Sequence, residues 1–206
     1  MYQNIFLDIR KMKMHLWDDQ KGHLEVPFRK YAYVKHSNGQ HVSLYGDRLK
    51  KVTSFDKDDP TLHESDVPPT TRFLVDNYGD SDEMSVGHRI MFFDIEVEVT
   101  DGFPDVQKAQ NVITSIALYD CITEKYFTYC FDPEKRIKSY TKDDEVVEFY
   151  DTEYEMLNKF FQKYLEIRPT IVSGWNTEFF DIPYLYNRAV RVLGPEVANL
   201  LSPISQ

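Results

Sequence analysis

The stretch Met91–Val99 constrains the fold most, because it is an apolar run with an acid at every second position. Side chains alternate between the two faces of a β-strand, so Asp94, Glu96 and Glu98 share the face opposite the apolar residues. Acids two residues apart lie about 6.6 Å apart along a strand. They repel one another unless a positive charge compensates them. The acidic face is therefore either a site for a divalent cation with oxygen ligands or a polar surface that meets water.

Length and composition indicate a chain that buries a sizeable core. The 206 residues allow one large or two small domains, and 42% of them are apolar. No apolar run approaches the roughly 20 residues that span a bilayer, so we expect a cytoplasmic protein with no membrane partner. We expect Cys121 and Cys130 to be free packing residues. The net charge of −10 argues against a protein that coats nucleic acid, but an enzyme can gather metal ions with its acids.

Two domains are expected, a β-rich N-terminal domain at residues 1–87 and a second domain at residues 88–206. Aromatic and β-branched residues predict strands at Asn4–Ile9, Met12–Trp17, His23–Phe28, Tyr31–Lys35 and His41–Tyr45. Asn38-Gly39 predicts a two-residue hairpin turn between the last two of these strands. Asp, Ser, Thr and Pro are enriched at residues 53–71, which predicts a connector without regular structure. A strand is predicted at Arg72–Val75.

The second domain is predicted to be α/β, within a chain that is α+β overall. The predicted elements after the acidic strand are strands Val112–Tyr119, Lys125–Phe131 and Val146–Phe149, a helix from Thr152 to Arg168, a strand at Ile171–Trp175 and a helix from Ile182 to Leu193. This order predicts a sheet covered by helices, with the strand after the first helix parallel to the acidic strand.

Asp181 lies between the last predicted strand and the last predicted helix. Ligands collect at the carboxyl ends of parallel strands, where Asp181 is expected to lie near Asp94 and Glu96. The alternative is a helix N-cap. The two roles are compatible, because the helix dipole favours an ionised carboxylate at this position and an ionised carboxylate can bind a metal ion.

Two segments resemble the first two exonuclease motifs of the family B DNA polymerases. Phe93-Asp94-Ile95-Glu96 matches F-D-I-E. The second motif, N-x-x-x-F-D-x-P-Y-L-x-x-R, is matched by Asn176, Phe180, Asp181, Pro183, Tyr184, Leu185 and Arg188. The surrounding sequence is most similar to the polymerases of T-even-like and related phages. The resemblance implies an RNase H-like 3′–5′ exonuclease domain, preceded by the polymerase's N-terminal domain, that removes mispaired nucleotides from a primer 3′ end.

The resemblance implies a two-metal site that binds Mg²⁺ or Mn²⁺. Asp94 would bridge both ions, Glu96 would bind the ion that generates hydroxide, and Asp181 would hold the second ion. Asn176 would orient the loop of Asp181 and contact DNA. Glu98 has no counterpart in the motif, and we interpret it either as a solvated acid or as an acid that supports the metal ligands without binding the metal.

Phe103 lies in the loop after the acidic strand, where related phage enzymes place an aromatic side chain against the frayed primer terminus. Stacking on an aromatic ring accepts any base, as an editing enzyme requires. The alternative for Phe103 is a core aromatic that anchors its loop.

The resemblance also implies partners. They are DNA, both a single-stranded primer 3′ end and a primer–template, the rest of the polymerase in cis or as a second polypeptide, and a sliding clamp bound through that remainder. The family's third motif, Tyr-x-x-x-Asp on a later helix, is not reached before Gln206, so we expect an N-terminal part of a polymerase with little activity alone. The alternative is a non-catalytic subunit of a split polymerase that docks on a separate polypeptide and contacts DNA.

Overall fold

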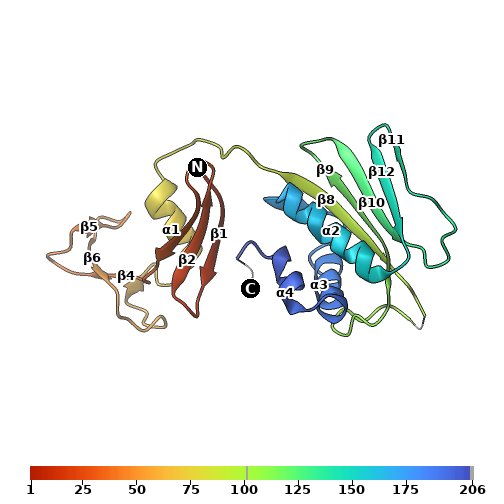
Figure 1. The fold of residues 1–206 in the computed structure, drawn as a ribbon. Helices are drawn as coiled ribbons and strands as arrows, with labels where there is room; N and C mark the ends of the chain where they lie inside the picture. The colour runs from red at the N-terminus through yellow and green to blue at the C-terminus, as the bar shows by residue number, and fades with distance from the viewer. Residues whose placement is uncertain (101, 205–206) are drawn as a thin grey trace. The chain divides into compact units, whose positions relative to one another are not determined.

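The computed structural model describes residues 1–100 and 102–204 and divides the chain into two units, Met1–Gly87 and His88–Gln206 (Figure 1). Strands and helices occur in both units, so the predicted mixed α and β class is confirmed. Over the described residues, no helix combines the length and the apolar character needed to cross a membrane.

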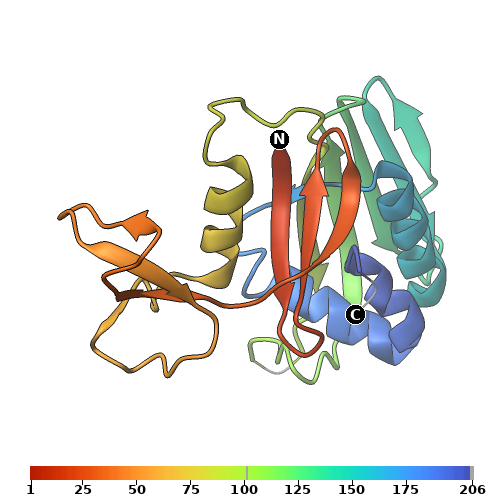
Figure 2. The ribbon, with the colours of Figure 1, turned by 90° about the vertical axis from the view of Figure 1, so that its left-hand side faces the viewer.

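The first unit combines two antiparallel sheets with helix α1 (Pro69–Tyr78). One sheet has the order β1-β2-β3, with bounds Tyr2–Asp8, Lys13–Asp18 and Gly22–Pro27. The other has the order β5-β6-β4-β7, with bounds His41–Val42, Arg48–Val52, Ala32–Lys35 and Leu62–His63. Figure 2 shows α1 alongside β1. Phe73 of α1 joins Met14 and Leu16 of β2 in a small core.

The predicted strand at Arg72–Val75 is wrong, because these residues form the middle of α1. A short apolar run fits a strand or a helix equally well, and here the helix signals decide. Pro69 is the first helical residue, a position that tolerates proline because its missing N–H would have had no partner in the helix. The predicted connector at residues 53–71 is also not free of regular structure, since it contains β7 and the start of α1.

The predicted hairpin at Asn38-Gly39 is also wrong, because β4 and β5 pair with opposite sides of β6. The Gly39 N–H instead donates to the His36 carbonyl at 2.9 Å. A Cβ atom on Gly39 would lie 2.4 Å from the main chain of Leu49. Glycine is therefore required here for close approach to β6 rather than for a two-residue turn.

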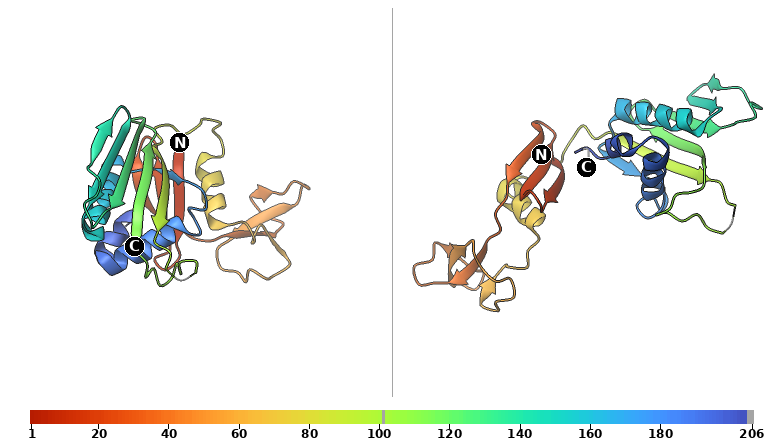
Figure 3. Two further views of the ribbon diagram at one scale, coloured as in Figure 1. Left: turned by 90° about the vertical axis from the view of Figure 1, so that its right-hand side faces the viewer. Right: turned by 60° about the horizontal axis from the view of Figure 1, so that its bottom comes forward.

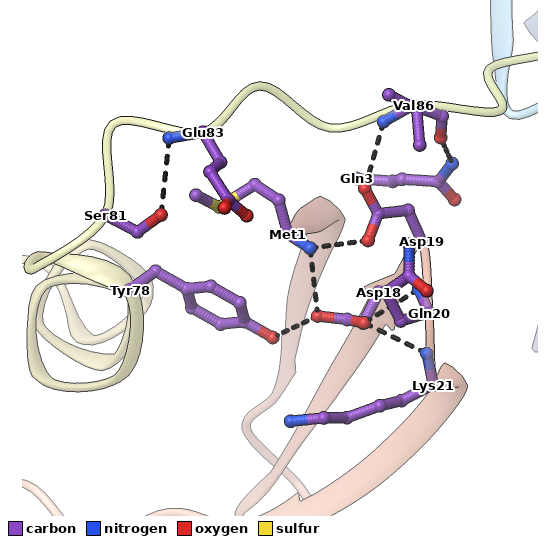
Figure 4. Close-up of polar contacts among 10 residues, drawn as sticks. All are labelled: Met1, Gln3, Asp18, Asp19, Gln20, Lys21, Tyr78, Ser81, Glu83 and Val86. Atoms are coloured by element: carbon purple, nitrogen blue, oxygen red, sulfur yellow. Dashed lines mark hydrogen bonds and ion pairs between the residues drawn. The ribbon is translucent and has the colours of Figure 1, made fainter.

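Two acids at the end of β2 join the strands to α1 and to the segment that follows it (Figure 4). Asp18 accepts hydrogen bonds from the Gln20 N–H at 2.9 Å and the Tyr78 hydroxyl at 2.8 Å. Asp19 accepts one from the Val86 N–H at 3.0 Å. The Gln20 N–H is the main cause that lowers the pKa of Asp18 to about 2, with a further contribution from Tyr78. The ionised carboxylate of Asp18 is therefore part of the folded first unit.

The second unit is built on one sheet with the order β11-β12-β10-β9-β8-β13. In that order, the bounds are Tyr140–Lys142, Glu145–Tyr150, Lys125–Phe131, Ile113–Asp120, Ile90–Val97 and Ile171–Ser173. The long strands β8, β9 and β10 are antiparallel neighbours. β13 runs parallel to β8, which confirms the predicted parallel return.

The helices of the second unit are α2 (Glu153–Ile167), α3 (Asp181–Val192), α4 (Pro195–Ala198) and the 3₁₀ turn η1 (Asn199–Leu201). Figure 3 shows α2 running along the sheet with α3 and α4 beside it. The predicted helix start at Thr152 is confirmed, since the Thr152 hydroxyl caps α2 by accepting from the Glu155 N–H at 3.2 Å. Phe93 of β8 packs against Phe160 of α2 with ring centroids 5.6 Å apart. This core fixes the position of β8 and of the acids on it.

Candidate active site

β8 has one buried face and one exposed face, as its alternation predicts. Met91, Phe93 and Ile95 are at most 5% exposed, whereas Asp94 and Glu96 are exposed. Core packing of the apolar side chains therefore points both acids away from the helices, on a strand that is paired along its length with β9.

The alternation does not continue past the end of β8 at Val97. Val99, expected on the apolar face, is 68% exposed and lies outside the strand. Glu98 is also exposed, and its N–H donates to the Val112 carbonyl at 2.9 Å. The strand therefore presents two acids, and the role of Glu98 as a solvated acid stays a prediction.

Asp181 reaches β8 because the neighbouring strand is short. β13 ends at Ser173, which pairs with Phe92, so this edge of β8 has no strand partner farther along. Asp181 Oδ1 accepts a hydrogen bond from the Ile95 N–H there, at 3.3 Å. The carboxylate thus satisfies a strand donor that would otherwise be an unpaired buried group.

The predicted N-cap role of Asp181 is wrong. Asp181 is the first residue of α3, and the cap position is Phe180, which provides no side-chain hydrogen bond. Burial raises the pKa of Asp181 above its usual range; the Ile95 N–H opposes this rise, and the negative charges of Asp94 and Glu96 add to it. Burial is the largest of these causes, so it disfavours the ionised form that a metal ligand needs.

Within residues 1–100 and 102–204, no three His, Cys, Asp or Glu side chains are arranged as a group that could hold a metal ion. Asp94, Glu96 and Asp181 therefore do not form a closed ligand set. Their chemistry fits a hard divalent cation, because every donor is a carboxylate oxygen. A cation would also favour the ionised form of Asp181, which burial and two negative neighbours disfavour.

Gly174 allows the chain to turn away from β8 at the end of β13. A Cβ atom at this position would lie 2.3 Å from the Phe93 carbonyl oxygen and 2.4 Å from Thr177 Oγ1. Real Cβ atoms do not approach main-chain oxygen so closely, so any larger residue must displace the loop that leads to Asp181.

Asn176 shapes the same loop through its main chain. Its φ of 58° lies in the left-handed region, which asparagine tolerates better than most residues. Its carbonyl oxygen accepts from the N–H groups of Phe179 and Phe180, at 3.1 and 3.0 Å. These bonds support the predicted role of Asn176 in placing Asp181, and the residue is exposed. Contact between Asn176 and DNA stays a prediction.

Phe103 is 80% exposed, which argues against the alternative of a core aromatic. Its ring lies 5.1 Å from that of Phe180, the residue before Asp181. The structure thus places an exposed aromatic ring next to the loop of the candidate site. Stacking of Phe103 on DNA stays a prediction.

Sequence reasoning assigned no role to Arg188, although it matches the second motif. Arg188 forms a double ion pair with Glu153, with Nε to Oε1 at 2.8 Å and Nη2 to Oε2 at 2.5 Å. The two side chains are only 11% and 9% exposed. The motif indicated that Arg188 matters, but nothing in the sequence predicts that its partner is an acid 35 positions away.

Comparison with known proteins gives one family match, over residues 78–200, to "DNA polymerase family B, exonuclease domain". The DNA-directed DNA polymerase of Escherichia phage RB69 is 32% identical over 138 residues, which cover 56% of this chain and 15% of the relative. The DNA-directed DNA polymerase of Enterobacteria phage T4 is 31% identical over 133 residues, covering 54% and 15%.

DNA polymerase 1 of Saccharolobus solfataricus is 32% identical over 145 residues, which cover 64% of this chain and 16% of the relative. The chain therefore spans only a small part of the length of each of these relatives. The matches confirm the resemblance that the two sequence motifs indicated.

Proposed function

The chain belongs to DNA polymerase family B, and from this premise we propose that its second unit removes mispaired nucleotides from the 3′ end of a DNA primer. The single observation that carries the proposal is the hydrogen bond between Asp181 and Ile95. It ties the acid at the start of α3 to the main chain between Asp94 and Glu96. This contact beside the strand that carries Asp94 and Glu96 supports a common site for the acids of the two matched motifs.

Asp94, Glu96 and Asp181 would hold Mg²⁺ or Mn²⁺ in this proposal. The chemistry that a pair of such ions supplies is activation of water and stabilisation of the leaving 3′ oxygen. The family's exonuclease domains generally depend on divalent metal ions. The exposed acids of β8 leave their oxygens open to a phosphodiester, and buried Asp181 is held in place by the Ile95 N–H.

Phe103 would stack on the unpaired terminal base, and the ring of Phe180, 5.1 Å away, would hold Phe103 in place. A π-face is common to all bases, so this contact would not select among mispaired nucleotides. Asn176 would contact the same DNA strand from the loop before α3.

The proposal includes further partners: primer–template DNA, the remaining polymerase polypeptide in cis or as a second chain, and a sliding clamp bound through that remainder.

A second candidate is a non-catalytic subunit of a split polymerase, which contacts DNA without cutting it. The three interacting carboxylates favour the enzyme, because DNA binding alone gains nothing from negative charges beside phosphates. The cytoplasmic location stays a prediction.

The test compares matched Glu→Gln changes at neighbouring exposed positions in the complete polymerase that contains this chain. Glu96→Gln should abolish Mg²⁺-dependent shortening of a 5′-labelled mispaired primer, whereas Glu98→Gln should leave it unchanged. Full shortening by the Glu96→Gln enzyme would contradict the proposal. If Glu96→Gln and Glu98→Gln reduce primer shortening equally, the cause is the loss of surface charge and not the loss of a metal-binding residue.

A further inference from the structure

Helix α3 carries more than Asp181. Asn187 and Arg188 follow Tyr184 by three and four positions, so both lie on the same side of the helix as Tyr184. All three donate hydrogen bonds to main-chain carbonyl oxygens of residues 106–111, the segment that follows Phe103. We call these three residues the loop clamp.

Each clamp bond has the geometry of a normal hydrogen bond. Tyr184 Oη donates to the Asn111 carbonyl at 2.8 Å, and Asn187 Nδ2 donates to the Val106 carbonyl at 2.9 Å. Arg188 Nη1 donates to the Gln110 carbonyl at 2.7 Å. The clamp therefore holds both ends of the segment.

Arg188 is itself fixed by Glu153, at the start of α2. Glu153 Oε1 accepts from Arg188 Nε and also from the Ile113 N–H, each at 2.8 Å. A carboxylate in the first turn of a helix is stabilised by the helix dipole. The guanidinium group is thus held on one side by a charged partner while it donates to the loop on the other.

The clamped segment has a defined shape of its own. Asp105 Oδ1 accepts from the N–H groups of Gln107 and Lys108, at 2.9 and 3.0 Å. The Ala109 N–H donates to the Asp105 carbonyl at 2.8 Å, and Ala109 is completely buried. The clamp therefore positions a turn that its own hydrogen bonds already hold in shape.

Two routes connect the clamp to Phe103. Along the chain, the clamp holds Val106, three residues after Phe103. Through space, the ring of Phe103 contacts Phe180 at 5.1 Å, and Phe180 contacts the clamp residue Tyr184 at 5.5 Å.

We propose that Asn187 is a positioning residue for excision. Together with the other two clamp residues it holds residues 106–111, so that Phe103 stays against Phe180, next to the metal-binding acids. This inference rests on the proposed exonuclease function. Asn187 acts only through the loop, because its clamp bond involves neither Glu153 nor an acid of β8.

The test variant is Asn187→Ala in the complete polymerase, with Asn158→Ala as the matched control. Asn158 Nδ2 also donates to a main-chain carbonyl, that of Tyr154 at 2.9 Å, but within α2 and away from the loop. Asn187→Ala should slow excision of a mispaired primer about threefold to tenfold, the effect of one net hydrogen bond. Primer extension should be unchanged, and Asn158→Ala should alter neither rate.

A double-mutant cycle separates positioning from a general structural effect. In a Phe103→Ala background, Asn187→Ala should cause no further loss of excision, because the ring that it positions is absent. Equal losses in both backgrounds, no loss in either, or an equal loss with Asn158→Ala would overturn the inference. Full excision by an Asp94→Asn enzyme would overturn the proposed function and this inference with it. Excision abolished by Asp94→Asn, without coupling between Asn187 and Phe103, would overturn the inference alone.

Discussion

The Asp181 carboxylate accepts a hydrogen bond from the Ile95 N–H at 3.3 Å, on the edge of β8 that β13 leaves without a strand partner. Ile95 lies between Asp94 and Glu96 in the chain, so one main-chain donor joins the acids of two distant motifs. The position of Asp181 thus depends on where β13 ends and on how the chain leaves it.

We expect Gly174→Ala to disturb excision through the loop that carries Asp181. The new Cβ atom would lie 2.3 Å from the Phe93 carbonyl, so the main chain must move. Overpacking of this kind costs about 1–3 kcal/mol of stability. Thermal unfolding and excision rates of the complete polymerase are the measurements.

Gly194→Ala is the control for this substitution, because a Cβ atom there meets no atom within 4 Å although its φ of 94° is strained. It should cost about 1–3 kcal/mol from backbone strain, because its φ and ψ of 94° and 160° suit glycine alone, and it should leave excision unchanged. If Gly174→Ala excises at the parent rate, the loop does not set the position of Asp181.

Phe103→Ala should slow excision of a mispaired primer more than it slows primer extension. A stacked base contributes about 1–3 kcal/mol, and Phe103 is 80% exposed next to the site. Phe179→Ala serves as the control, since Phe179 is 76% exposed and has no assigned role. Equal effects on excision and extension, or the same loss from both variants, would argue against stacking by Phe103.

Arg188→Met should destabilise the second unit by about 3–5 kcal/mol, because it leaves the Glu153 carboxylate buried without its partner. The double variant Arg188→Met/Glu153→Leu should lose less than the sum of the single changes. Urea unfolding followed by circular dichroism measures both effects. Glu134→Gln, which breaks an exposed ion pair with Arg136, should change stability by about 0–1 kcal/mol. Additive single changes would mean that the buried pair is not coupled.

The first unit should lose stability in acid through Asp18. The pKa of Asp18 is lowered to about 2 in the folded chain, chiefly by the Gln20 N–H, against an ordinary value of 3.8. A lowered folded pKa means that the stabilisation is fully present above pH 3.8 and disappears as the pH falls through about 2. The stability difference between the parent and Asp18→Asn should therefore shrink over this range.

Urea unfolding followed by Trp17 fluorescence in a Trp175→Phe background reports on the first unit, because Trp17 lies in β2. Asp82→Asn, at an exposed acid of the same unit, is the control and should show no such pH dependence. A difference between the parent and Asp18→Asn that stays constant from pH 5 to about pH 2 would contradict the assignment.

The predictable parts of this structure are those that local rules determine. Alternation placed Asp94 and Glu96 on the exposed face of β8, and the N-cap residue Thr152 marked the start of α2. Local rules failed where packing or distant contacts decide. The run at Arg72–Val75 joined a helix, and Asp181 bonded to a strand instead of capping α3.

The Glu153–Arg188 pair is another contact that local sequence rules could not predict. The motif marked Arg188, but its partner is on another helix, and only the fold brings the two together. The loop clamp could not be predicted either, because its acceptors are main-chain carbonyls that carry no sequence signal.

The most direct test is Mn²⁺ titration of the isotope-labelled 206-residue chain, followed through the Ile95 amide signal by NMR. Ile95 lies between the two strand acids, and its N–H donates to the third. Substoichiometric Mn²⁺ should broaden this signal selectively in the parent and in Glu98→Ala, but not in the triple variant Asp94→Ala/Glu96→Ala/Asp181→Ala. An Ile95 signal that is unaffected in the parent, or equally broadened in the triple variant, would contradict the assignment of these carboxylates as the metal site.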